Sequence, residues 1–264
     1  MPDSTKIQLL PISVCIIAGN EASRIRRALD SVAGWTSEII VVLNDDVNDG
    51  TDKIAEEFGA KIFHEPWKGH IAQKNSSAQK ASSKWILGLD ADESISPALK
   101  KEIQELFARP ERLQGFAAFS FPRCTFYGGR WIRHGDWYPD RQIRLWQRGQ
   151  AQWGGIDPHD KLLVRGRIGK LKSDLHHLSN DSVNTRIQKI ISYTDEFVRQ
   201  HSQGAAGPVI SGLIIRPGWR FLRAYLLRLG FLDGWQGLFI AWLNAFSTAS
   251  KYAKMRERES RPQQ

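Results

Sequence analysis

The stretch Trp85-Ile86-Leu87-Gly88-Leu89-Asp90-Ala91-Asp92-Glu93 places two aspartates, one residue apart, directly after a short apolar run. The run predicts a buried β-strand, because it is short, uninterrupted and rich in branched and aromatic side chains. Two carboxylates just past a strand end can converge on one divalent cation, and Mg²⁺ is typically held by one or two carboxylates plus phosphates. The alternative is the acidic start of a helix, since Glu93 and Ser94 precede Ser96-Pro97.

Strand and helix patterns alternate from the start of the chain to this stretch. Their short connections favour a parallel α/β sheet. In such sheets ligands bind beyond the carboxyl ends of the strands. Strands are predicted over residues 12–18, 38–43, 60–64 and 84–90, and helices over 21–32, 52–58 and 70–81.

Polar residues stand at the ends of three of these strands. Asn20-Glu21 follows the first, Asn44-Asp45-Asp46 follows the second, and Asp90-Ala91-Asp92 ends the fourth. Asn20 is also expected to cap the helix that begins beside it. Because the carboxyl ends of parallel strands meet at one edge of a sheet, we expect these side chains to line a shared site.

The second half of the chain has a less regular pattern. Residues 127–140 are rich in Gly, Trp, Arg and Tyr without a clean period, which predicts a functional loop. Residues 204–207 predict a linker or mobile loop, and the tail over 256–264 is expected to fray. Helices are predicted over 97–107 and 183–201, and strands over 115–121, 142–146 and 161–164.

The composition is that of an ordinary globular protein. With 264 residues, 41% hydrophobic and 25% charged, the chain can form one large core, or one domain with an appendage. Cys15 and Cys124 do not make a disulfide framework, and Cys15 lies in a strand pattern, which favours a reduced, cytosolic location. Residues 1–8 do not resemble a secretory signal, and no run of about 18 apolar residues predicts a transmembrane helix.

The formal net charge of +9 is unevenly distributed. Between Arg216 and Arg258, eight basic residues accompany only two acidic ones, and the same segment carries nine aromatic residues. This combination is typical of proteins that bind an anionic membrane surface or nucleic acid. Nucleic acid is the weaker hypothesis, because the acidic strand ends would repel phosphate without a metal ion.

Residues 235–253 show helical spacing. Phe239, Trp242, Leu243, Phe246 and Ala249 fall on one face of this predicted helix. Such a stripe is often buried against the same protein. The neighbouring arginines and aromatic residues favour the second interpretation, a helix pair that lies in a membrane interface.

Ten short motifs are spread over about residues 10–255. They are Ile12–Glu21, Asp49–Thr51, His64–Gly69, Ala72–Asn75, Trp85–Glu93, Tyr138–Asp140, Arg144–Trp146, Pro158–Asp160, Asp174–His177 and Gly230–Trp235. Together they resemble glycosyltransferase family 2, and most of all the small bacterial glucosyltransferases of the lipopolysaccharide inner core. The joint pattern is specific for the family and much less specific for the sugar or the acceptor.

The resemblance implies an α/β architecture. Residues 10–203 would form a GT-A nucleotide-diphospho-sugar transferase fold, a Rossmann-like mixed sheet flanked by helices. The basic and aromatic composition of residues 204–264, rather than the resemblance, predicts a C-terminal amphipathic helical extension that associates with the membrane. The implied location is cytoplasmic, peripheral on the inner face of the cytoplasmic membrane.

The resemblance also implies an activity. It is that of an inverting glycosyltransferase that depends on a divalent metal, Mg²⁺ or Mn²⁺. The donor would be a UDP-sugar, with UDP-glucose expected first. The acceptor would be a heptose of the lipopolysaccharide core or a related lipid-linked glycan.

A nucleotide-sugar site follows from the same resemblance. Asn20 and Glu21 would line the nucleotide pocket. The family's acidic residue after the second strand is replaced by Asn44, with Asp45 and Asp46 next to it, and which of the three contacts the base stays open. An asparagine can still hydrogen-bond a base. The other implied binding residues are Gln73, Lys74, Asn75, Asp90 and Ala91, of which Lys74 is alternatively a solvated helix lysine.

The resemblance also assigns a metal site. Asp92 would bind the metal ion directly, and Asp90 would contact the ribose or the metal ion. His177 would complete the metal or diphosphate site, with His176 as the competing neighbour. Because a lone histidine is often structural, the alternative for His177 is a place in the packing.

Asp160 matches the catalytic base of the family, although the subfamily usually has Glu there. An ionised carboxylate would take the proton as the acceptor hydroxyl attacks the anomeric carbon. The alternative for Asp160 is a turn residue paired with Lys161, and Asp140 and Asp136 are the other candidate bases. Arg141 and Arg144 would contact phosphate or an anionic acceptor, or else face solvent without a role. Trp153-Gly154-Gly155 would form a flexible loop that closes on donor and acceptor, or Gly154-Gly155 would be a simple turn.

Three other functions fit parts of the pattern. The acceptor could instead be polyprenyl phosphate, or the chain could be a non-catalytic module that binds sugar nucleotides or membranes. A nucleotidyltransferase also uses acidic residues at a strand end. It is disfavoured, because no glycine-rich phosphate loop follows the first strand.

Overall fold

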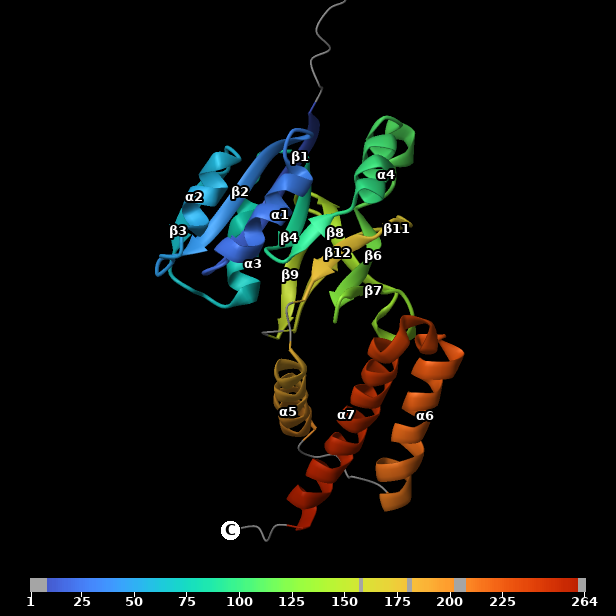
Figure 1. The fold of residues 1–264 in the computed structure, drawn as a ribbon. Coiled ribbons are helices and arrows are strands. Elements are labelled where there is room, and N and C mark those ends of the chain that lie inside the picture. The colour runs from blue at the N-terminus through green and yellow to red at the C-terminus, as the bar shows by residue number, and fades with distance from the viewer. Residues whose placement is uncertain (1–8, 157–158, 180–181, 202–207, 261–264) are drawn as a thin grey trace, which may run out of the picture. The chain divides into compact units, whose positions relative to one another are not determined.

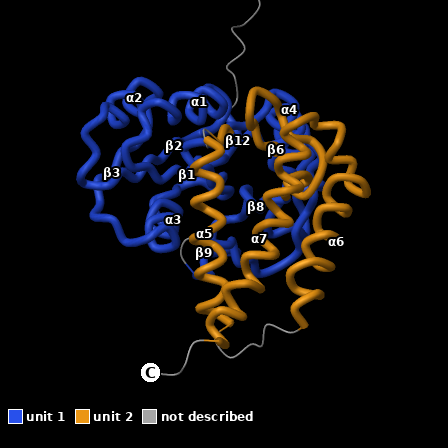
Figure 2. Tube along the Cα trace, turned by 60° about the horizontal axis from the view of Figure 1, so that its bottom comes forward, with its two compact units in different colours: residues 1–123, 141–177 blue, residues 124–140, 178–264 orange. Residues whose placement is uncertain are grey.

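The computed structural model describes residues 9–156, 159–179, 182–201 and 208–260. Two compact units make up the chain, and Figure 2 colours them separately. Unit 1 comprises residues 1–123 and 141–177, and unit 2 comprises residues 124–140 and 178–264. These units divide the chain at other points than the boundary expected at residue 204, because the segments 124–140 and 178–201 pack with the C-terminal helices. The linker expected at 204–207 lies outside the described residues.

A mixed sheet forms the centre of unit 1 (Figure 1). Its strands run in the order β3-β2-β1-β4-β8-β6-β12-β5, with β11 beside β6. The first four strands are parallel, as the alternating pattern predicted, and β8 pairs antiparallel with β4. The strands are β1 Leu10–Ala18, β2 Thr36–Asn44, β3 Lys61–Glu65, β4 Trp85–Asp90, β5 Glu93–Ile95, β6 Ala118–Tyr127, β8 Asp140–Gln147, β11 Ile168–Lys170 and β12 Leu175–Leu178.

Helices cover both faces of this sheet. Side chains alternate along β1, so that Val14 and Ile16 pack in one core cluster with α1, while Cys15 packs in the other with α3. A separate hairpin of β9 (Ala151–Ile156) and β10 (His159–Val164) adds Trp153 to the second cluster. The helices are α1 Ala22–Val32, α2 Thr51–Glu57, α3 His70–Gln79 and α4 Pro97–Phe107.

The helix starts follow local chemistry, with one difference from expectation. Ser96 caps α4 by accepting a hydrogen bond from the backbone of Leu99 at 3.1 Å. The prediction that Asn20 caps α1 is wrong. Glu21 holds that position without a side-chain cap, and Asn20 instead accepts a hydrogen bond from the backbone N–H of Asn48 at 3.0 Å.

Part of the predicted loop over 127–140 is ordered structure. The strand expected at 115–121 begins later and runs on to Tyr127 as β6. Gly128 and Gly129, with φ of 56° and 89°, then turn the chain into β7 (Arg130–Ile132), which pairs antiparallel with the end of β6. Residues Gly135–Trp137 form a 3₁₀ turn.

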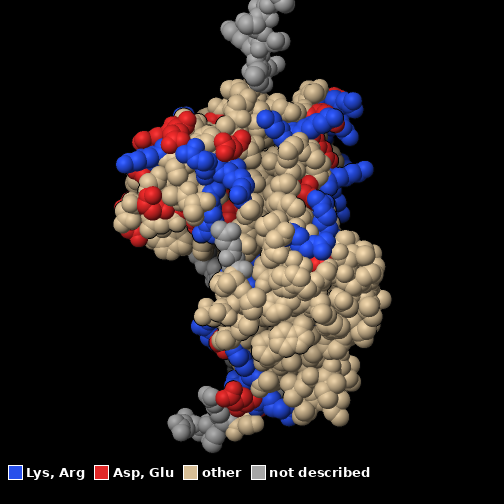
Figure 3. All heavy atoms as spheres, in the orientation of Figure 1, with Lys and Arg blue, Asp and Glu red and all other residues tan. Residues whose placement is uncertain are grey.

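Unit 2 is otherwise helical. It contains α5 (Val183–Gln200), α6 (Arg216–Leu222) between the π-helical turns Ser211–Ile215 and Arg223–Leu227, the 3₁₀ turn Gly230–Asp233, and α7 (Gly234–Ser260). No helix within the described ranges is long and apolar enough to cross a membrane. In Figure 3 the visible face over α6 and the first part of α7 carries almost no charged side chains, whereas charged side chains gather at the C-terminal end of α7.

The last helix differs from expectation in two respects. The predicted fraying from residue 256 is wrong as far as Ser260, because Arg258 donates hydrogen bonds to the carbonyls of Val198 and His201 at the end of α5. Residues 261–264 lie outside the described part of the chain. The expected apolar stripe is not buried as a unit, since Leu243 is buried whereas Trp242 and Phe246 are exposed and stack on each other.

Candidate active site at the strand ends

The predicted polar residues come together at the carboxyl edge of the sheet in unit 1. Strand register aligns Ile17 of β1 with Asp90 of β4, and Ala18 of β1 with Leu43 of β2. Asn20, Asn44 and Asp90 therefore follow three adjacent parallel strands at the same edge. This arrangement is the one expected from the sequence, and it places the candidate site where parallel sheets bind ligands.

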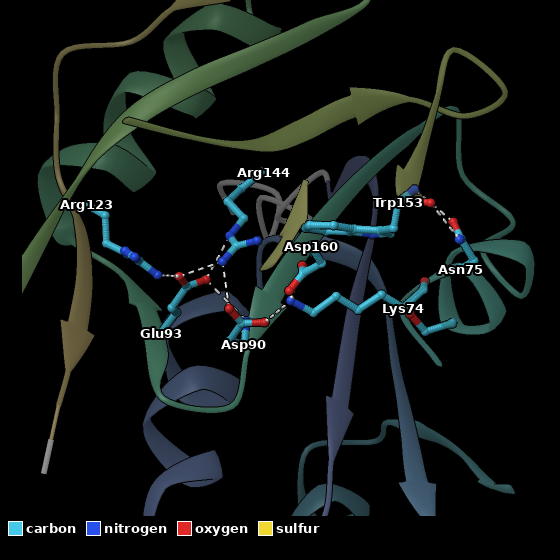
Figure 4. A network of polar contacts seen from close by, with 9 residues as sticks. Lys74, Asn75, Asp90, Glu93, Arg123, Arg144, Trp153 and Asp160 are labelled. Carbon is cyan, nitrogen blue, oxygen red and sulfur yellow. Dashed lines mark hydrogen bonds and ion pairs between the residues drawn. The ribbon is translucent and has the colours of Figure 1, made fainter. Parts of the chain in front are cut away.

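Lys74 on α3 joins the two most important carboxylates of this edge. Its Nζ lies 2.7 Å from Oδ1 of Asp90 and 2.9 Å from Oδ2 of Asp160 (Figure 4). The side chains of Lys74, Asp90 and Asp160 are 10%, 30% and 14% exposed, so the cluster is partly accessible. The alternative of a solvated helix lysine is wrong for Lys74, and Asp160 forms an ion pair with Lys74 at the start of β10.

Arg144 on β8 forms the other side of the network. Its Nη2 lies 2.6 Å from Oδ2 of Asp90, and its Nη2 and Nε contact the two carboxylate oxygens of Glu93 at 2.8 and 2.9 Å. Arg123 adds a contact to Glu93 at 3.2 Å. Arg144 is buried, so the expectation of a solvent-facing strand residue is wrong. Its position holds Asp90 from the side opposite to Lys74.

The aromatic ring of Trp153 contacts both cations, Lys74 and Arg144. The Lys74 ammonium lies 4.6 Å from the centre of the Trp153 ring, and the Arg144 guanidinium lies 5.4 Å from it. Asn75 fixes the backbone of Trp153 through two hydrogen bonds of 2.9 Å (Figure 4). Gly88 leaves space for the rings of Trp146 and Trp153, since a Cβ at this position would lie 3.0 Å from the Trp146 ring and 3.4 Å from the Trp153 ring.

These contacts set the electrostatics of the site. Burial alone would raise the pKa of Asp90, but the charges of Arg144 and then Lys74 outweigh it, so the pKa of Asp90 lies well below its usual value. Burial alone would lower the pKa of Arg144, but Asp90 and Glu93 raise it above its usual value. Asp90 is therefore ionised at neutral pH.

Two of the three predicted metal ligands lie together. Strand β12 pairs with β5 so that His177 stands opposite Glu93, and this register brings Nε2 of His177 to 3.3 Å from Oδ2 of Asp92. Asp90 points both oxygens at Lys74 and Arg144 instead. Among the residues that the structure describes, no three His, Cys, Asp or Glu side chains form a complete cation site.

The Asp92–His177 pair is nevertheless suited to a divalent metal ion. A carboxylate oxygen and an imidazole nitrogen are both ligands of Mn²⁺, whereas Mg²⁺ prefers oxygen alone. The two side chains are 27% and 18% exposed, which leaves room for phosphate oxygens as further ligands. The residues present therefore fit such an ion, and Asp92 and His177 are the side chains that would hold it.

Glu21 lies near the same carboxylate. Its Oε2 forms an ion pair of 2.7 Å with Arg24, and its backbone N–H donates to Oγ1 of Thr51 at 2.9 Å. Burial, and secondarily the charge of Asp92, raise the pKa of Glu21 above its usual value, although Arg24 partly opposes this. A cation or a hydrogen-bond donor beside Glu21 and Asp92 would relieve this repulsion.

The residues expected to hold the base lie at the end of β2. Asn44 is half-buried, whereas Asp45 and Asp46 are exposed. A Cβ at Gly19 would lie 3.5 Å from Nδ2 of Asn44, so the backbone between β1 and α1 passes close to this amide. Which of the three residues contacts a base stays a prediction.

Gln73 is fully buried on α3. Neither polar atom of its side chain has a hydrogen-bond partner among the described residues, which is unusual for a buried amide. Ala91, the other predicted binding residue at the turn after β4, is buried between the two aspartates. The roles of both toward a nucleotide stay predictions.

The remaining candidates have other partners. Arg141 donates from Nη2 to the carbonyls of Ser120 and Leu171, both at 2.7 Å. Asp136 belongs to unit 2, where it is buried and paired with arginines. Sequence reasoning did not predict the roles of Glu93 and Arg123. The only signal was that Glu93 follows Asp92 directly. It predicted a closing loop at Trp153-Gly154-Gly155, whereas these residues lie in β9 and the Trp153 ring contacts Lys74 and Arg144.

Comparison with known proteins identifies the family. A model described as Glycosyl transferase family 2 matches residues 13–166. The chain belongs to glycosyltransferase family 2. It is therefore a transferase, and the alternative of a non-catalytic module loses its support.

Two relatives and one solved structure illustrate the membership. An uncharacterized glycosyltransferase of Rickettsia typhi is 30% identical over 93% of this chain and 87% of its own length. The lipopolysaccharide core biosynthesis glycosyltransferase LpsC of Rhizobium meliloti is 26% identical over 97% of each chain. The mannosyltransferase PcManGT from Pyrobaculum calidifontis, solved in complex with GDP-Man and Mn²⁺, is 14% identical over 97% of this chain and 90% of that one, with a TM-score of 0.50. The structural likeness confirms the expected GT-A fold.

Proposed function

We propose that this glycosyltransferase is an inverting enzyme that transfers a sugar from a UDP-sugar to a lipopolysaccharide core or related lipid-linked glycan. Glucose is the first candidate for the transferred sugar. The observation that carries the proposal is the position of Lys74 between Asp90 and Asp160. One ammonium group thereby links the strand-end carboxylate expected beside the donor to the carboxylate expected to act as base.

The donor side is supported by the polar edge of the sheet. Lys74 is able to exchange its two carboxylate contacts for a phosphate oxygen of the donor, because an ammonium carries three rotatable N–H donors. Arg144 holds Asp90 in place while this happens, since its guanidinium also binds Glu93 in a bidentate manner. Asp90 then keeps an acceptor oxygen free for a ribose hydroxyl.

The chemistry that we propose is a direct displacement. The acceptor hydroxyl oxygen forms a bond with the anomeric carbon while the bond from that carbon to the diphosphate oxygen breaks, which inverts the configuration. The hydroxyl proton passes to the Asp160 carboxylate. The products are the new glycoside and the nucleoside diphosphate, and the proton on Asp160 later returns to solvent.

Asp92 and His177 are the residues that would hold a divalent metal ion. When bound, the ion would neutralise charge on the diphosphate leaving group. The similar mannosyltransferase PcManGT was solved with Mn²⁺, which supports a divalent metal in this fold. The carboxylate–imidazole pair favours Mn²⁺ over Mg²⁺.

The acceptor is the least constrained part of the proposal. The relative LpsC is named for lipopolysaccharide core biosynthesis, which supports a core heptose as acceptor. Polyprenyl phosphate is the second candidate. Its nucleophile would be a phosphate oxygen, which is already ionised at neutral pH. Transfer to this acceptor would therefore not need Asp160 as a general base.

Calorimetric titration tests the donor side. UDP, UDP-glucose and GDP-mannose are titrated into the wild type with Mn²⁺ or with EDTA. We expect the tightest binding for a uridine nucleotide with Mn²⁺, and its loss in the Asp92→Asn variant. Asp30→Asn, at an exposed position on α1, is the matched control and should bind normally. Equal binding with and without metal in all variants would contradict the proposed metal site.

Transfer assays test the acceptor. Truncated lipopolysaccharide that ends in heptose and polyprenyl phosphate are each offered with UDP-glucose. Transfer to the heptose that is lost in Asp160→Asn supports the first acceptor. Transfer to polyprenyl phosphate that persists in Asp160→Asn supports the second and removes Asp160 from the mechanism.

A further inference from the structure

The helical segment from Val209 to Phe246 in unit 2 exposes a large apolar surface. It contains sixteen of the 25 large hydrophobic side chains that are exposed within the described ranges. Ile214, Trp219 and Leu227 are 65%, 57% and 66% exposed. Figure 3 shows that the visible face over α6 and the first part of α7 is almost free of charge. Soluble monomers rarely leave so much contiguous apolar surface uncovered, so this face is expected to have a partner.

The packing of this segment is reversed relative to an ordinary surface helix. Between residues 211 and 227 the buried positions hold the small residues Gly212, Pro217 and Ala224, while bulky apolar side chains such as Ile214, Trp219 and Leu227 are exposed. A Cβ on Gly212 would lie 2.9 Å from the side chain of Tyr252 on α7, so the two helices approach closely. Small residues inside and large apolar residues outside are typical of helices whose neighbour is lipid.

Basic side chains accompany the apolar surface. Arg216, Arg220 and Arg223 line a cavity of about 480 Å³ together with Ile215, Trp219 and Thr248. This cavity combines an aromatic wall with guanidinium groups, which bind phosphate in a bidentate manner.

The positive charge around the cavity is incompletely neutralised. The buried carboxylate of Asp136 pairs with Arg220 at 2.9 Å, Arg223 at 2.9 Å and Arg228 at 3.2 Å, so three guanidinium groups share one carboxylate. Arg216 contacts the Tyr252 hydroxyl and lies 4.9 Å from that ring. Burial, and secondarily the charge of Arg220, lower the pKa of Lys251 on the neighbouring helix. An anion is therefore the complementary ligand.

We propose that the helical segment 209–246 of unit 2 docks on an anionic phospholipid membrane, with its exposed apolar side chains entering the lipid and the arginine-lined cavity beside Ile215 and Trp219 binding a headgroup phosphate. Charge decides between a membrane and a second copy of this chain. In a symmetric dimer the same patch would face itself and bring the two arginine clusters together. An anionic lipid surface instead attracts them, by about fivefold in affinity for each basic residue near the surface.

Co-sedimentation with vesicles tests the proposal on the full chain, without donor or acceptor. Vesicles of phosphatidylethanolamine and phosphatidylglycerol are compared with vesicles of phosphatidylcholine alone. We expect binding to the anionic vesicles that weakens with added salt, because charge screening removes the electrostatic part and leaves the apolar part. Absence of binding to anionic vesicles at low salt overturns the proposal.

Two double variants separate the apolar part from the charged part. Ile214→Ser with Trp219→Ser should weaken vesicle binding more than about tenfold, because two large apolar side chains no longer enter the lipid. Arg216→Gln with Arg220→Gln should weaken binding to anionic vesicles about 25-fold, at about fivefold for each basic residue, and reduce its salt dependence. Because Ile214 and Trp219 are exposed, circular dichroism and the thermal transition of the apolar variant should be those of the wild type. The arginine variant loses one of three guanidinium partners of the buried Asp136, so its circular dichroism should be unchanged while its thermal transition falls slightly.

Matched controls come from exposed positions of unit 1. Trp67→Ser with Ile168→Ser removes one aromatic and one aliphatic side chain, and Arg109→Gln with Arg112→Gln removes two charges. Both controls should bind vesicles as the wild type does, and equal losses in controls and test variants would overturn the proposal.

Light scattering on the same samples tests the competing occupant. A dimer that dissociates in the Ile214→Ser, Trp219→Ser variant, with vesicle binding unchanged, would show that the face joins two copies of the chain. That result overturns the proposal. The membrane experiment needs no turnover, so its failure and the failure of the proposed sugar transfer are recognised separately.

Discussion

Lys74 Nζ lies 2.7 Å from a carboxylate oxygen of Asp90 and 2.9 Å from one of Asp160, so that a single side chain of α3 holds the end of β4 and the start of β10 together. Both contacts are ion pairs between partly buried groups. A donor diphosphate that enters this edge of the sheet would compete for the same ammonium. Donor binding would therefore weaken the ion pair between Lys74 and Asp160, the proposed base.

The first prediction concerns this lysine. In the Lys74→Met variant we expect weaker binding of UDP and a fall in kcat/KM of about 10²- to 10³-fold, the size typical for removal of one preorganised donor from an active site. The loss arises because the incoming diphosphate then meets Asp160 without its cation and Asp90 with Arg144 alone. Calorimetry and steady-state kinetics measure the two effects.

Lys53→Met is the matched control, since Lys53 is exposed on α2. It should change neither UDP binding nor the rate. Normal UDP binding together with a normal rate in Lys74→Met would show that the Lys74 bridge is only structural.

The second prediction concerns Asp160. Replacement by Asn should lower kcat by about 10²- to 10⁴-fold, because the amide does not accept the hydroxyl proton. UDP binding should change little. Asp160→Glu should recover part of the activity, since it restores a carboxylate one methylene further out.

Asp140→Asn provides the control for this experiment, because Asp140 was the competing candidate base. It should keep most of the activity. A large loss in Asp140→Asn with an active Asp160→Asn variant would assign the base to Asp140 instead.

Strand-end residues could be predicted from sequence because their signals are local. The apolar runs that end at Ala18, Asn44 and Asp90 define three parallel strands, and parallel pairing brings their ends to one edge. The pairing of Asp92 with His177 was also expected, although only the register of β12 against β5 shows which histidine reaches the aspartate.

The rest of the site depends on pairings between distant segments. Arg144 reaches Asp90 and Glu93 because β8 lies antiparallel to β4, and nothing in the local pattern near residue 144 fixes that register. Trp153 lies beneath Lys74 for a similar reason, through the hairpin of β9 and β10. Periodicity predicts the elements, whereas these contacts arise from tertiary packing.

Which face of α7 is buried could not be predicted from the sequence, for a different reason. Its sequence carries large apolar side chains on more than one side, so the spacing of Phe239, Trp242 and Phe246 does not define the buried stripe. Gly237 decides part of it, because a Cβ at that position would lie 1.8 Å from the carbonyl oxygen of Gly230. A glycine that lets two backbone segments approach each other adds nothing to the hydrophobic pattern, so the pattern does not show that this side of the helix is buried.

The third prediction concerns the stability contributed by Arg144. Arg144→Met removes the guanidinium that binds the buried carboxylate of Glu93, which would keep a 3.2 Å contact with Arg123 and a 3.2 Å hydrogen bond from the backbone N–H of Asp90. Loss of one partner from a buried ion pair typically costs about 3–5 kcal/mol. Urea denaturation should show a decrease of this size in the free energy of unfolding.

Arg148→Met is the control, since Arg148 is exposed just after β8. The double variant Glu93→Gln, Arg144→Met should recover part of the loss, because it no longer buries an unpaired charge. A stability of Arg144→Met within about 1 kcal/mol of the wild type would contradict a buried ion pair and place both groups in contact with water.

The fourth prediction concerns Glu38, a buried glutamate of β2 away from the site. It accepts hydrogen bonds from Lys61 at 2.6 Å, from Ser13, and from the backbone and hydroxyl of Ser82 at 3.0 Å. Burial alone would raise the pKa of Glu38, but these hydrogen bonds outweigh it and lower the pKa to about 2. The folded protein therefore holds this carboxylate ionised in conditions where the unfolded chain does not.

The sign of the resulting pH dependence follows from the two pKa values. Because the folded pKa lies below the value of about 4.3 in the unfolded chain, Glu38 contributes its full stabilisation above about pH 4.3 and loses it as the pH falls toward 2. The shift corresponds to about 3 kcal/mol.

In Glu38→Gln the free energy of unfolding should be lower by about this amount at neutral pH, and the difference from the wild type should shrink as the pH falls below about 4. Urea titrations of wild type, Glu38→Gln and the exposed control Glu56→Gln over this pH range measure the effect. A difference between wild type and Glu38→Gln that stays constant down to about pH 2 would mean that Glu38 stabilises the fold by packing rather than by its charge.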